Sequence, residues 1–196
     1  MFNYNRIIVI GDLHGDFRAF VSVLLMCKLI NSEYKWTGKD TYVIQMGDIL
    51  DGKRPNVKLS SDYLKESGEI EIIKLIINLN AQASLLGGKV ISLLGNHELY
   101  PYYFGNNKKF INDYVKTSDI KNYPINFGMS RNTFFQPGNL GGIYMGKTRP
   151  LILQLGEFIF IHGSITRKLI DDNKIDNFVD LNLINYKTSA WLEGKG

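Results

Sequence analysis

Three short apolar runs, each ending in glycine and polar residues, set the pattern of this chain. The runs are IIVI (7–10), TYVIQMG (41–47) and KVISLLG (89–95), and each predicts a strand. IIVI is apolar without alternation, which is typical of a strand buried on both faces. Between them, residues 16–30 place apolar side chains at helical spacing, and residues 62–86 predict a long helix that Gly87 and Gly88 would stop. The order strand, helix, strand, helix, strand predicts βαβ units, and therefore an α/β fold with a mostly parallel sheet.

The second half of the chain changes character. Residues 99–150 are aromatic and rich in turn residues, which predicts an insertion of short helices and loops that forms either a cap over a site or a plain helical excursion. LILQLG (151–156) and EFIFIHG (157–163) predict a β-hairpin or two adjacent strands around Gly156. From residue 164 onward the chain is polar and predicted to be helical. We expect one domain over residues 1–196, because two domains would be cramped in this length.

Composition and charge exclude several classes of function. The formal net charge of +4 comes from scattered lysines, which is too weak a signal for nucleic-acid binding. No apolar run reaches the length of a membrane span, and the first residues lack the pattern of a signal peptide. With a single cysteine, Cys27, which we expect in the core, no intramolecular disulfide can form. These features favour a cytoplasmic protein without a membrane or nucleic-acid partner.

The ends of the strands carry the candidate chemistry. GDLHG (11–15), GDILDG (47–52), GNHE (95–98) and IHG (161–163) each follow a predicted strand, and they contain all three histidines of the chain. Because ligands bind at the carboxyl ends of parallel strands, we expect these polar side chains at one edge of the sheet. Oxygen and imidazole ligands from several strands, with one shared carboxylate, suit a pair of divalent metals. The candidate residues are Asp12, His14, Asp48, Asp51, Asn96, His97, Glu98 and His162.

This set of motifs resembles the calcineurin-like metallophosphoesterase superfamily. GNHE favours its phosphoprotein phosphatase branch, and residues 135–165 are similar in layout to the Shewanella-like protein phosphatases. The resemblance implies an αββα sandwich, which some schemes class as α+β, with the metals at the sheet edge. It also implies a phosphomonoester hydrolase that acts on phosphoserine, phosphothreonine or phosphotyrosine through a metal-bridging hydroxide.

The resemblance implies a role for each site residue. Asp12, His14 and Asp48 would bind the first metal, and Asp48, Asn96 and His162 the second. His97 would be the general acid, oriented by Asp51, with Glu98 supporting the ligands from behind. The ions would be Mn²⁺, Fe or Zn²⁺.

Two features depart from the family pattern. The second motif lacks the arginine that follows its last aspartate in the family, so the cation that grips phosphate is left open among Lys53, Arg54, Arg131 and Arg149. For each of these cations a solvated surface position is the plainer alternative. The family also has a further metal-binding histidine downstream, whereas no histidine follows His162 here. We therefore expect a fragment or a truncated homologue, with a weakened second metal site.

Two alternatives stay open at this point. One is a hydrolase of the same fold that acts on a nucleotide or a dinucleoside polyphosphate, with the aromatic residues 100–104 stacking a base. The other is a phosphate-binding module with weakened or lost catalysis, which the two departures would explain.

Overall fold

A three-stranded parallel sheet forms the centre of the molecule. The computed structural model describes residues 6–66 and 68–195. Strands β1 (Ile7–Ile10), β2 (Tyr42–Gln45) and β3 (Lys89–Ser92) lie in that order, with Ile7 beside Tyr42 and Tyr42 beside Lys89. The order and direction agree with the βαβ prediction, but β2 and β3 end earlier than the apolar runs suggested. The residues after each strand instead form the turns that carry the polar motifs.

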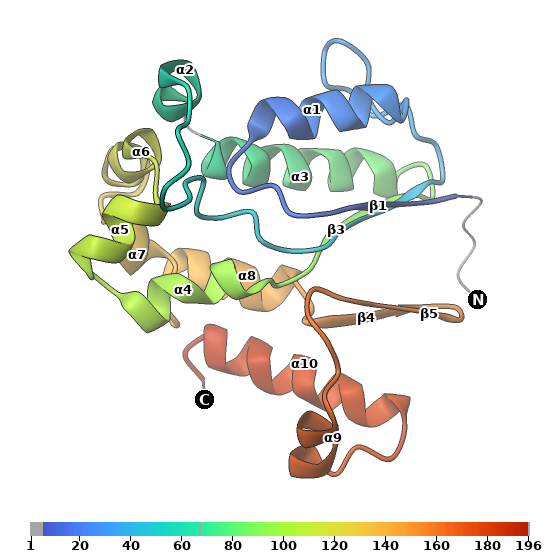
Figure 1. Cartoon of the computed structure of the whole chain (residues 1–196). Coiled ribbons are helices and arrows are strands. Elements are labelled where there is room, and N and C mark those ends of the chain that lie inside the picture. Colours follow the sequence, from blue (N-terminus) through green and yellow to red (C-terminus); the bar gives the residue numbers. More distant parts are fainter. Residues whose placement is uncertain (1–5, 67, 196) are drawn as a thin grey trace.

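Helices α1 (Phe17–Met26) and α3 (Glu69–Ser84) cover one face of this sheet (Figure 1). Phe20 and Leu24 of α1 and Leu79 of α3 are fully buried in the core cluster beneath them. Helix α1 begins where the Asp16 carboxylate accepts a hydrogen bond of 2.9 Å from the Ala19 amide, as expected of an N-cap residue. Cys27, at the end of α1, packs against this cluster but is only partly buried.

The other face of the sheet packs on a β-hairpin. Strands β4 (Ile152–Leu155) and β5 (Phe158–Ile161) pair in antiparallel fashion, as the sequence predicted. Ile44, Leu93 and Leu155 are buried together in one cluster that joins the two sheets. Helix α10 (Phe178–Leu192) packs Leu181 and Ile184 against Ile152 of the hairpin, next to the short α9 (Arg167–Asn173). The layers are therefore helix, sheet, sheet, helix, which is the αββα sandwich (Figure 1).

The predicted insertion is helical. The segment between β3 and β4 forms α4 (Asn96–Phe104), α5 (Lys108–Tyr114), α6 (Thr117–Phe127), α7 (Arg131–Phe134) and α8 (Leu140–Thr148). Helices α4 to α7 gather beyond the carboxyl ends of the parallel strands (Figure 1). This arrangement brings the insertion next to the polar turns.

The long helix predicted over residues 62–86 is instead two helices, α2 (Ser61–Lys65) and α3. The interruption has a tertiary cause that periodicity cannot reveal. Gly68 caps α3 and lies so close to the first polar turn that a Cβ there would stand 1.7 Å from the Gly15 carbonyl oxygen. Its amide also donates to Asp119 Oδ1 at 2.9 Å. The start of α3 is therefore fixed by its contact with the turn after β1.

Within the described residues, no helix is both long enough and apolar enough to cross a membrane.

Candidate metal centre

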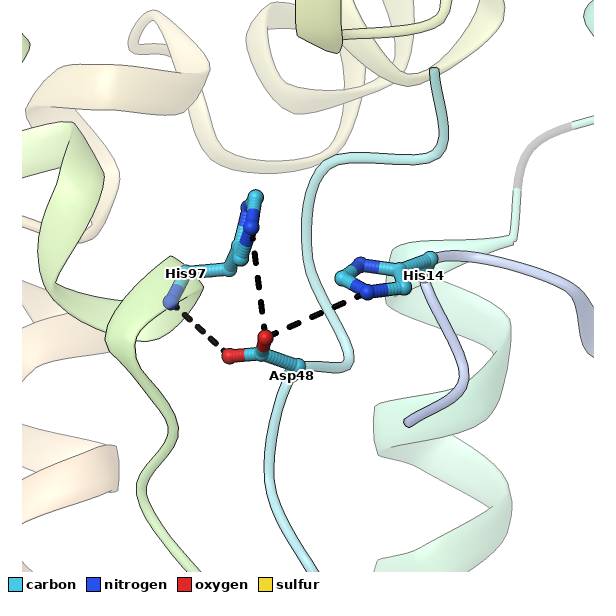
Figure 2. Close-up of side chains that lie close together, drawn as sticks. All are labelled: His14, Asp48 and His97. Carbon is cyan, nitrogen blue, oxygen red and sulfur yellow. Dashed lines mark hydrogen bonds and ion pairs between the residues drawn. The ribbon is translucent and has the colours of Figure 1, made fainter. Parts of the chain in front are cut away.

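The polar turns after β1, β2 and β3 meet at Asp48. Its Oδ2 lies 3.9 Å from Nε2 of His14 and 3.9 Å from Nε2 of His97, and Figure 2 shows both rings directed at this carboxylate. The other oxygen, Oδ1, accepts a hydrogen bond of 2.9 Å from the His97 amide. The carboxylate of Asp48, from the turn after β2, thus lies between His14 from the turn after β1 and His97 from the turn after β3.

His162 approaches the same carboxylate from the turn after β5. Its Nε2 lies 3.3 Å from Asp48 Oδ2 and 3.0 Å from Asn96 Oδ1, and its Nδ1 lies 3.8 Å from Asp12 Oδ1. Asp12 Oδ2 is in turn 3.6 Å from His14 Nε2. The five residues predicted as metal ligands are therefore brought together, although they lie on four separate segments.

Backbone carbonyls orient two of the imidazoles. His14 Nδ1 lies 2.9 Å from the Leu50 carbonyl oxygen, and His162 Nδ1 lies 2.8 Å from the Met46 carbonyl oxygen. A carbonyl oxygen only accepts, so each Nδ1 carries the proton. Each Nε2 then carries the lone pair with which a histidine binds a metal.

The turns are conformationally unusual. His14, Asp48 and Asp51 have φ values of 44°, 54° and 65°, in the left-handed region that residues with a Cβ rarely occupy. Gly95 permits the close approach between turns, because a Cβ there would lie 2.1 Å from Asp48 Oδ1. Such strain persists only where the surroundings enforce it, and it is concentrated at functional sites.

Glu98 provides that enforcement. Its buried carboxylate accepts backbone hydrogen bonds at 2.8 Å from Asp48 and from Ile49, at 3.3 Å from Leu50 and at 2.7 Å from Gly95. Glu98 therefore ties the turn after β2 to the turn after β3. That Glu98 supports metal ligands in this way stays a prediction.

The electrostatics at Asp48 favour a cation. The residue is 3% exposed, and burial, together with the nearby Glu98 charge, raises the pKa of the Asp48 carboxyl, which the neighbouring histidines oppose. A buried carboxylate of this kind is stabilised by a positive ion. Two groups in the described residues have ligand atoms within 4.8 Å of one another, namely His14, Asp48 and His97, and Asp12, Asp48 and His162. Asp48 belongs to both, and the donors are of the types that Mn²⁺, Fe and Zn²⁺ accept.

His97 has a further buried partner. Its Nδ1 lies 2.8 Å from Asp51 Oδ2, and Asp51 is fully buried. Behind Asp51, the Arg131 guanidinium donates to Asp51 Oδ1 at 2.8 Å and to both carboxylate oxygens of Glu69 at 2.7 Å. Burial raises the pKa of the Glu69 carboxyl to about 7, although the charge of Arg131 acts in the opposite direction.

The four candidate phosphate-binding cations have different surroundings. Arg54 reaches the metal centre: its guanidinium contacts His14 Nε2 and donates to the carbonyl oxygens of Asp51 and Lys53. The Lys53 ammonium instead donates to the Asn112 carbonyl oxygen on α5. Both side chains lie in the loop between β2 and α2.

Arg131 and Arg149 are neither surface cations nor accessible to a phosphate. Both side chains are almost fully buried, Arg131 against Asp51 and Glu69, and Arg149 with Nη1 3.7 Å from Glu98 Oε1. The expectation that they could grip a phosphate is corrected on this ground. Single cations in a sequence carry no sign of burial, so their buried anionic partners could not be foreseen.

Comparison with known proteins identifies the family. The model of the calcineurin-like phosphoesterases matches residues 5–194. The chain belongs to this family. Among curated relatives, it is 24% identical to Shewanella-like protein phosphatase 2 of Arabidopsis thaliana and 28% identical to Shewanella-like protein phosphatase 1 of Plasmodium berghei. Each alignment covers 96% of this chain but only 52% and 45% of the two relatives, so the chain spans about half their length.

Solved structures share the fold of this calcineurin-like phosphoesterase. A cold-active protein-tyrosine phosphatase of a psychrophilic Shewanella species superposes with a TM-score of 0.71, covering 95% of this chain and 49% of that chain at 19% identity. The family implies a dinuclear divalent metal centre, and the cluster around Asp48 supplies candidate ligands for it.

Sequence reasoning missed Glu69 and gave Arg131 and Tyr100 different roles. Glu69 and Arg131 lie behind Asp51, and the Tyr100 ring packs on His97 with centroids 4.4 Å apart. Glu69 resembles an ordinary acidic residue in the first turn of a helix. Only the contact of Tyr100 had a local signal, because Tyr100 lies three residues after His97 on the same helix.

Proposed function

We propose that this chain hydrolyses phosphate monoesters on proteins with the help of two divalent metals. The single observation that carries the proposal is the convergence of four separate segments on Asp48. Asp12, His14 and Asp48 would hold one ion, and Asp48, Asn96 and His162 the other. Mn²⁺ is the first ion to test, with Fe and Zn²⁺ as the alternatives. We expect weaker binding at the second position, since two of its three protein ligands, Asn96 and His162, are uncharged.

Bound metals would supply Lewis acidity and an activated water at this edge of the sheet. In the reaction, the oxygen of water forms a bond to phosphorus while the ester P–O bond breaks. The leaving oxygen takes a proton from Nε2 of His97 while the ring is an imidazolium that carries a proton on both nitrogens. The proton lost by the water returns to Nε2 through solvent. The products are inorganic phosphate and the free hydroxyl of the protein substrate.

His97 is placed for this proton transfer. The Asp51 carboxylate can only accept, so Nδ1 of His97 is protonated and the ring presents Nε2 toward Asp48. Arg54 is the proposed phosphate-binding cation, because its guanidinium already contacts the metal-facing nitrogen of His14. Binding of a metal to His14 would displace this contact and leave the guanidinium beside the phosphoryl oxygens.

A groove next to His97 would receive the phosphorylated residue. It has a volume of about 440 Å³ and is lined in part by Tyr100, Phe104, Phe110 and Tyr114. Tyr100 and Tyr114 have ring centroids 4.4 and 6.2 Å from that of His97. The insertion at 99–150 thereby acts as a cap on one side of the site, within a single domain. The aromatic lining suits phosphotyrosine at least as well as phosphoserine, and the Shewanella protein of similar fold is a protein-tyrosine phosphatase.

The test is hydrolysis of phosphotyrosine and phosphoserine peptides with and without Mn²⁺. We expect metal-dependent release of phosphate that Asp48→Asn abolishes and that Asp62→Asn, a change at an α2 surface residue, leaves intact. A folded, metal-loaded chain without turnover would contradict the proposal and favour the phosphate-binding alternative. Faster hydrolysis of a dinucleoside polyphosphate than of either peptide would favour the nucleotide alternative.

A further inference from the structure

Asp51 is held from three directions inside the protein. Its Oδ2 faces His97 Nδ1 at 2.8 Å, its Oδ1 accepts from Arg131 Nη2 at 2.8 Å, and its amide donates to Glu69 Oε1 at 2.9 Å. The side chain is fully buried. A carboxylate turns easily about its last torsion when only one oxygen is bound. With both oxygens engaged, the carboxylate of Asp51 has a single orientation.

Arg131 is itself immobilised. Its Nε and Nη2 form a fork on the Glu69 carboxylate, at 2.7 Å to Oε2 and 2.7 Å to Oε1. Tyr123 adds a hydrogen bond of 3.1 Å from its hydroxyl to Glu69 Oε2. All three of these side chains, Glu69, Tyr123 and Arg131, are buried. A fork of this kind fixes direction as well as distance.

We propose that Glu69 and Arg131 are positioning residues for proton transfer, acting through Asp51 to aim the His97 ring at the leaving-group oxygen. The inference rests on the proposed function, since it concerns the acid of that reaction. A general acid contributes only when its proton lies within hydrogen-bond reach of the departing atom, so a loss of aim removes its contribution. Glu69 lies on α3, Arg131 on α7 and Asp51 in the turn after β2. Through Arg131, a helix of the insertion thus contacts the residue that orients His97.

The first variant is Arg131→Lys, which keeps the charge but cannot bond Asp51 and both Glu69 oxygens with a fork. Its turnover is compared on phenyl phosphate, whose leaving oxygen needs a proton, and on 2,4-dinitrophenyl phosphate, whose leaving group departs as an anion. We expect the loss on phenyl phosphate to exceed the loss on the dinitrophenyl ester about tenfold or more. If turnover fell equally on the two esters, Glu69 and Arg131 would have only a structural role, and the inference would be overturned.

Matched controls separate this effect from folding. Arg167→Lys makes the same change at an exposed ion pair on α9 and should alter neither ester. Glu69→Gln keeps the side-chain size while removing one half of the fork, so it serves if Arg131→Lys does not fold. Its own control is Glu71→Gln, a half-exposed residue of the same helix. We expect Glu69→Gln to discriminate between the two esters and Glu71→Gln not to do so.

A second readout does not depend on turnover. The chain has three histidines, so the ¹⁵N imidazole signals that disappear in a His97→Gln variant can be assigned to His97. We expect a single Nδ1-protonated tautomer for His97 in the unaltered chain at pH 8, and a mixture in Arg131→Lys. An unchanged tautomer in the variant would overturn the inference even if the chain shows no phosphatase activity, whereas a mixture without activity would count against the proposed function alone.

Discussion

At the residue scale, the candidate metal centre depends on a small number of side-chain atoms that surround one carboxylate oxygen. Asp48 Oδ2 lies within 3.9 Å of imidazole nitrogens from His14, His97 and His162. Two of these rings are fixed by backbone carbonyls, and His97 is fixed by Asp51. Each of these residues is therefore important mainly because it places one nitrogen or oxygen atom at the site, and less because its side chain fills space.

Arg54 and Lys53 provide a test at this scale, because they are neighbours with different surroundings. We expect Arg54→Ala to lower kcat/KM for a phosphopeptide by about 10- to 100-fold, the effect of losing a charge-assisted hydrogen bond of about 1.5–3 kcal/mol. Lys53→Ala should change it less than threefold, since its ammonium is bound to the Asn112 carbonyl oxygen. Steady-state kinetics at fixed Mn²⁺ measures both. A larger loss for Lys53→Ala than for Arg54→Ala would reverse the assignment.

The sequence predicted which polar residues meet at this site better than it predicted the residues packed behind them. Asp12, His14, Asp48, Asn96 and His162 could be named because each follows a predicted strand, and parallel strands bring their ends together. Arg131 and Arg149 could not be placed, because burial of a cation depends on anionic partners far away in sequence. Glu69 is 18 residues from the Asp51 amide that it binds, and 62 residues from Arg131.

At the scale of elements, the helices that follow the strands stabilise the polar turns. The first turn of α4 carries Glu98, which bonds to the turn after β2, and the first residue of α3 is Glu69, which bonds to Asp51. The sequence predicted where β1, α1 and the hairpin of β4 and β5 lie, because their apolar patterns are local. It was wrong that β1 is buried on both faces, since Val9 is 52% exposed, and α1 ends at Met26 rather than at residue 30. The sequence also joined α2 and α3 into one helix, because the contact of Gly68 with Gly15 that starts α3 is not local.

Replacing Glu98 tests the link between α4 and the turn after β2. Glu98→Gln presents an amide nitrogen to backbone N–H donors, and it also removes the charge beside Arg149. We expect the free energy of unfolding to fall by about 3 kcal/mol or more, as for a broken buried charge pair. We also expect Mn²⁺ affinity to fall. Chemical denaturation and metal titration give the two values, with Glu157→Gln on the exposed β4–β5 turn as the control. Unchanged metal affinity in a destabilised variant would contradict the link.

The raised pKa of Glu69 predicts a pH dependence of stability. The groups that face this carboxyl are Asp51, Asp119, Tyr123 and Arg131, and burial outweighs the effect of Arg131, so the pKa rises from 4.5 to about 7. The folded state then holds the proton more tightly than the unfolded state. This contribution to stability is full below pH 4.5 and is lost as the pH rises to about 7, with a slope of at most about 1.4 kcal/mol per pH unit.

Chemical denaturation between pH 4.5 and 8 checks this. We expect Glu69→Gln to remove that part of the pH dependence, so that the difference between the two chains changes across this range. Parallel curves for the unaltered and the Gln chains would show that the Glu69 pKa is not raised.

At the scale of the whole molecule, the two sheets must stay packed for the site to be complete. The three-stranded sheet supplies the turns with Asp12, His14, Asp48 and Asn96, whereas His162 follows β5 of the hairpin. The apolar cluster between the sheets therefore fixes the distance between His162 and the other candidate ligands.

Leu155 lies in this cluster and is 1% exposed. We expect Leu155→Ala to lower the free energy of unfolding by about 2–5 kcal/mol through the cavity that it leaves. It should also weaken metal binding, because the hairpin that carries His162 can shift. Leu85→Ala, at an exposed position after α3, should alter stability by less than about 0.5 kcal/mol. Thermal unfolding measures the change in stability, and calorimetric titration measures Mn²⁺ binding. If Leu155→Ala bound Mn²⁺ as tightly as the unaltered chain, packing between the sheets would not be coupled to metal binding.

The most direct test of a metal centre built on Asp48 is an Mn²⁺ titration of the chain followed by electron paramagnetic resonance. If Asp48 is shared between two metal positions, the chain will bind two ions, the second more weakly, and the second will produce the spectrum of an exchange-coupled pair. Asp48→Asn should abolish the coupled spectrum, and Asp62→Asn should leave it unchanged. A chain that binds a single ion, or two ions without coupling, would contradict a shared centre at Asp48.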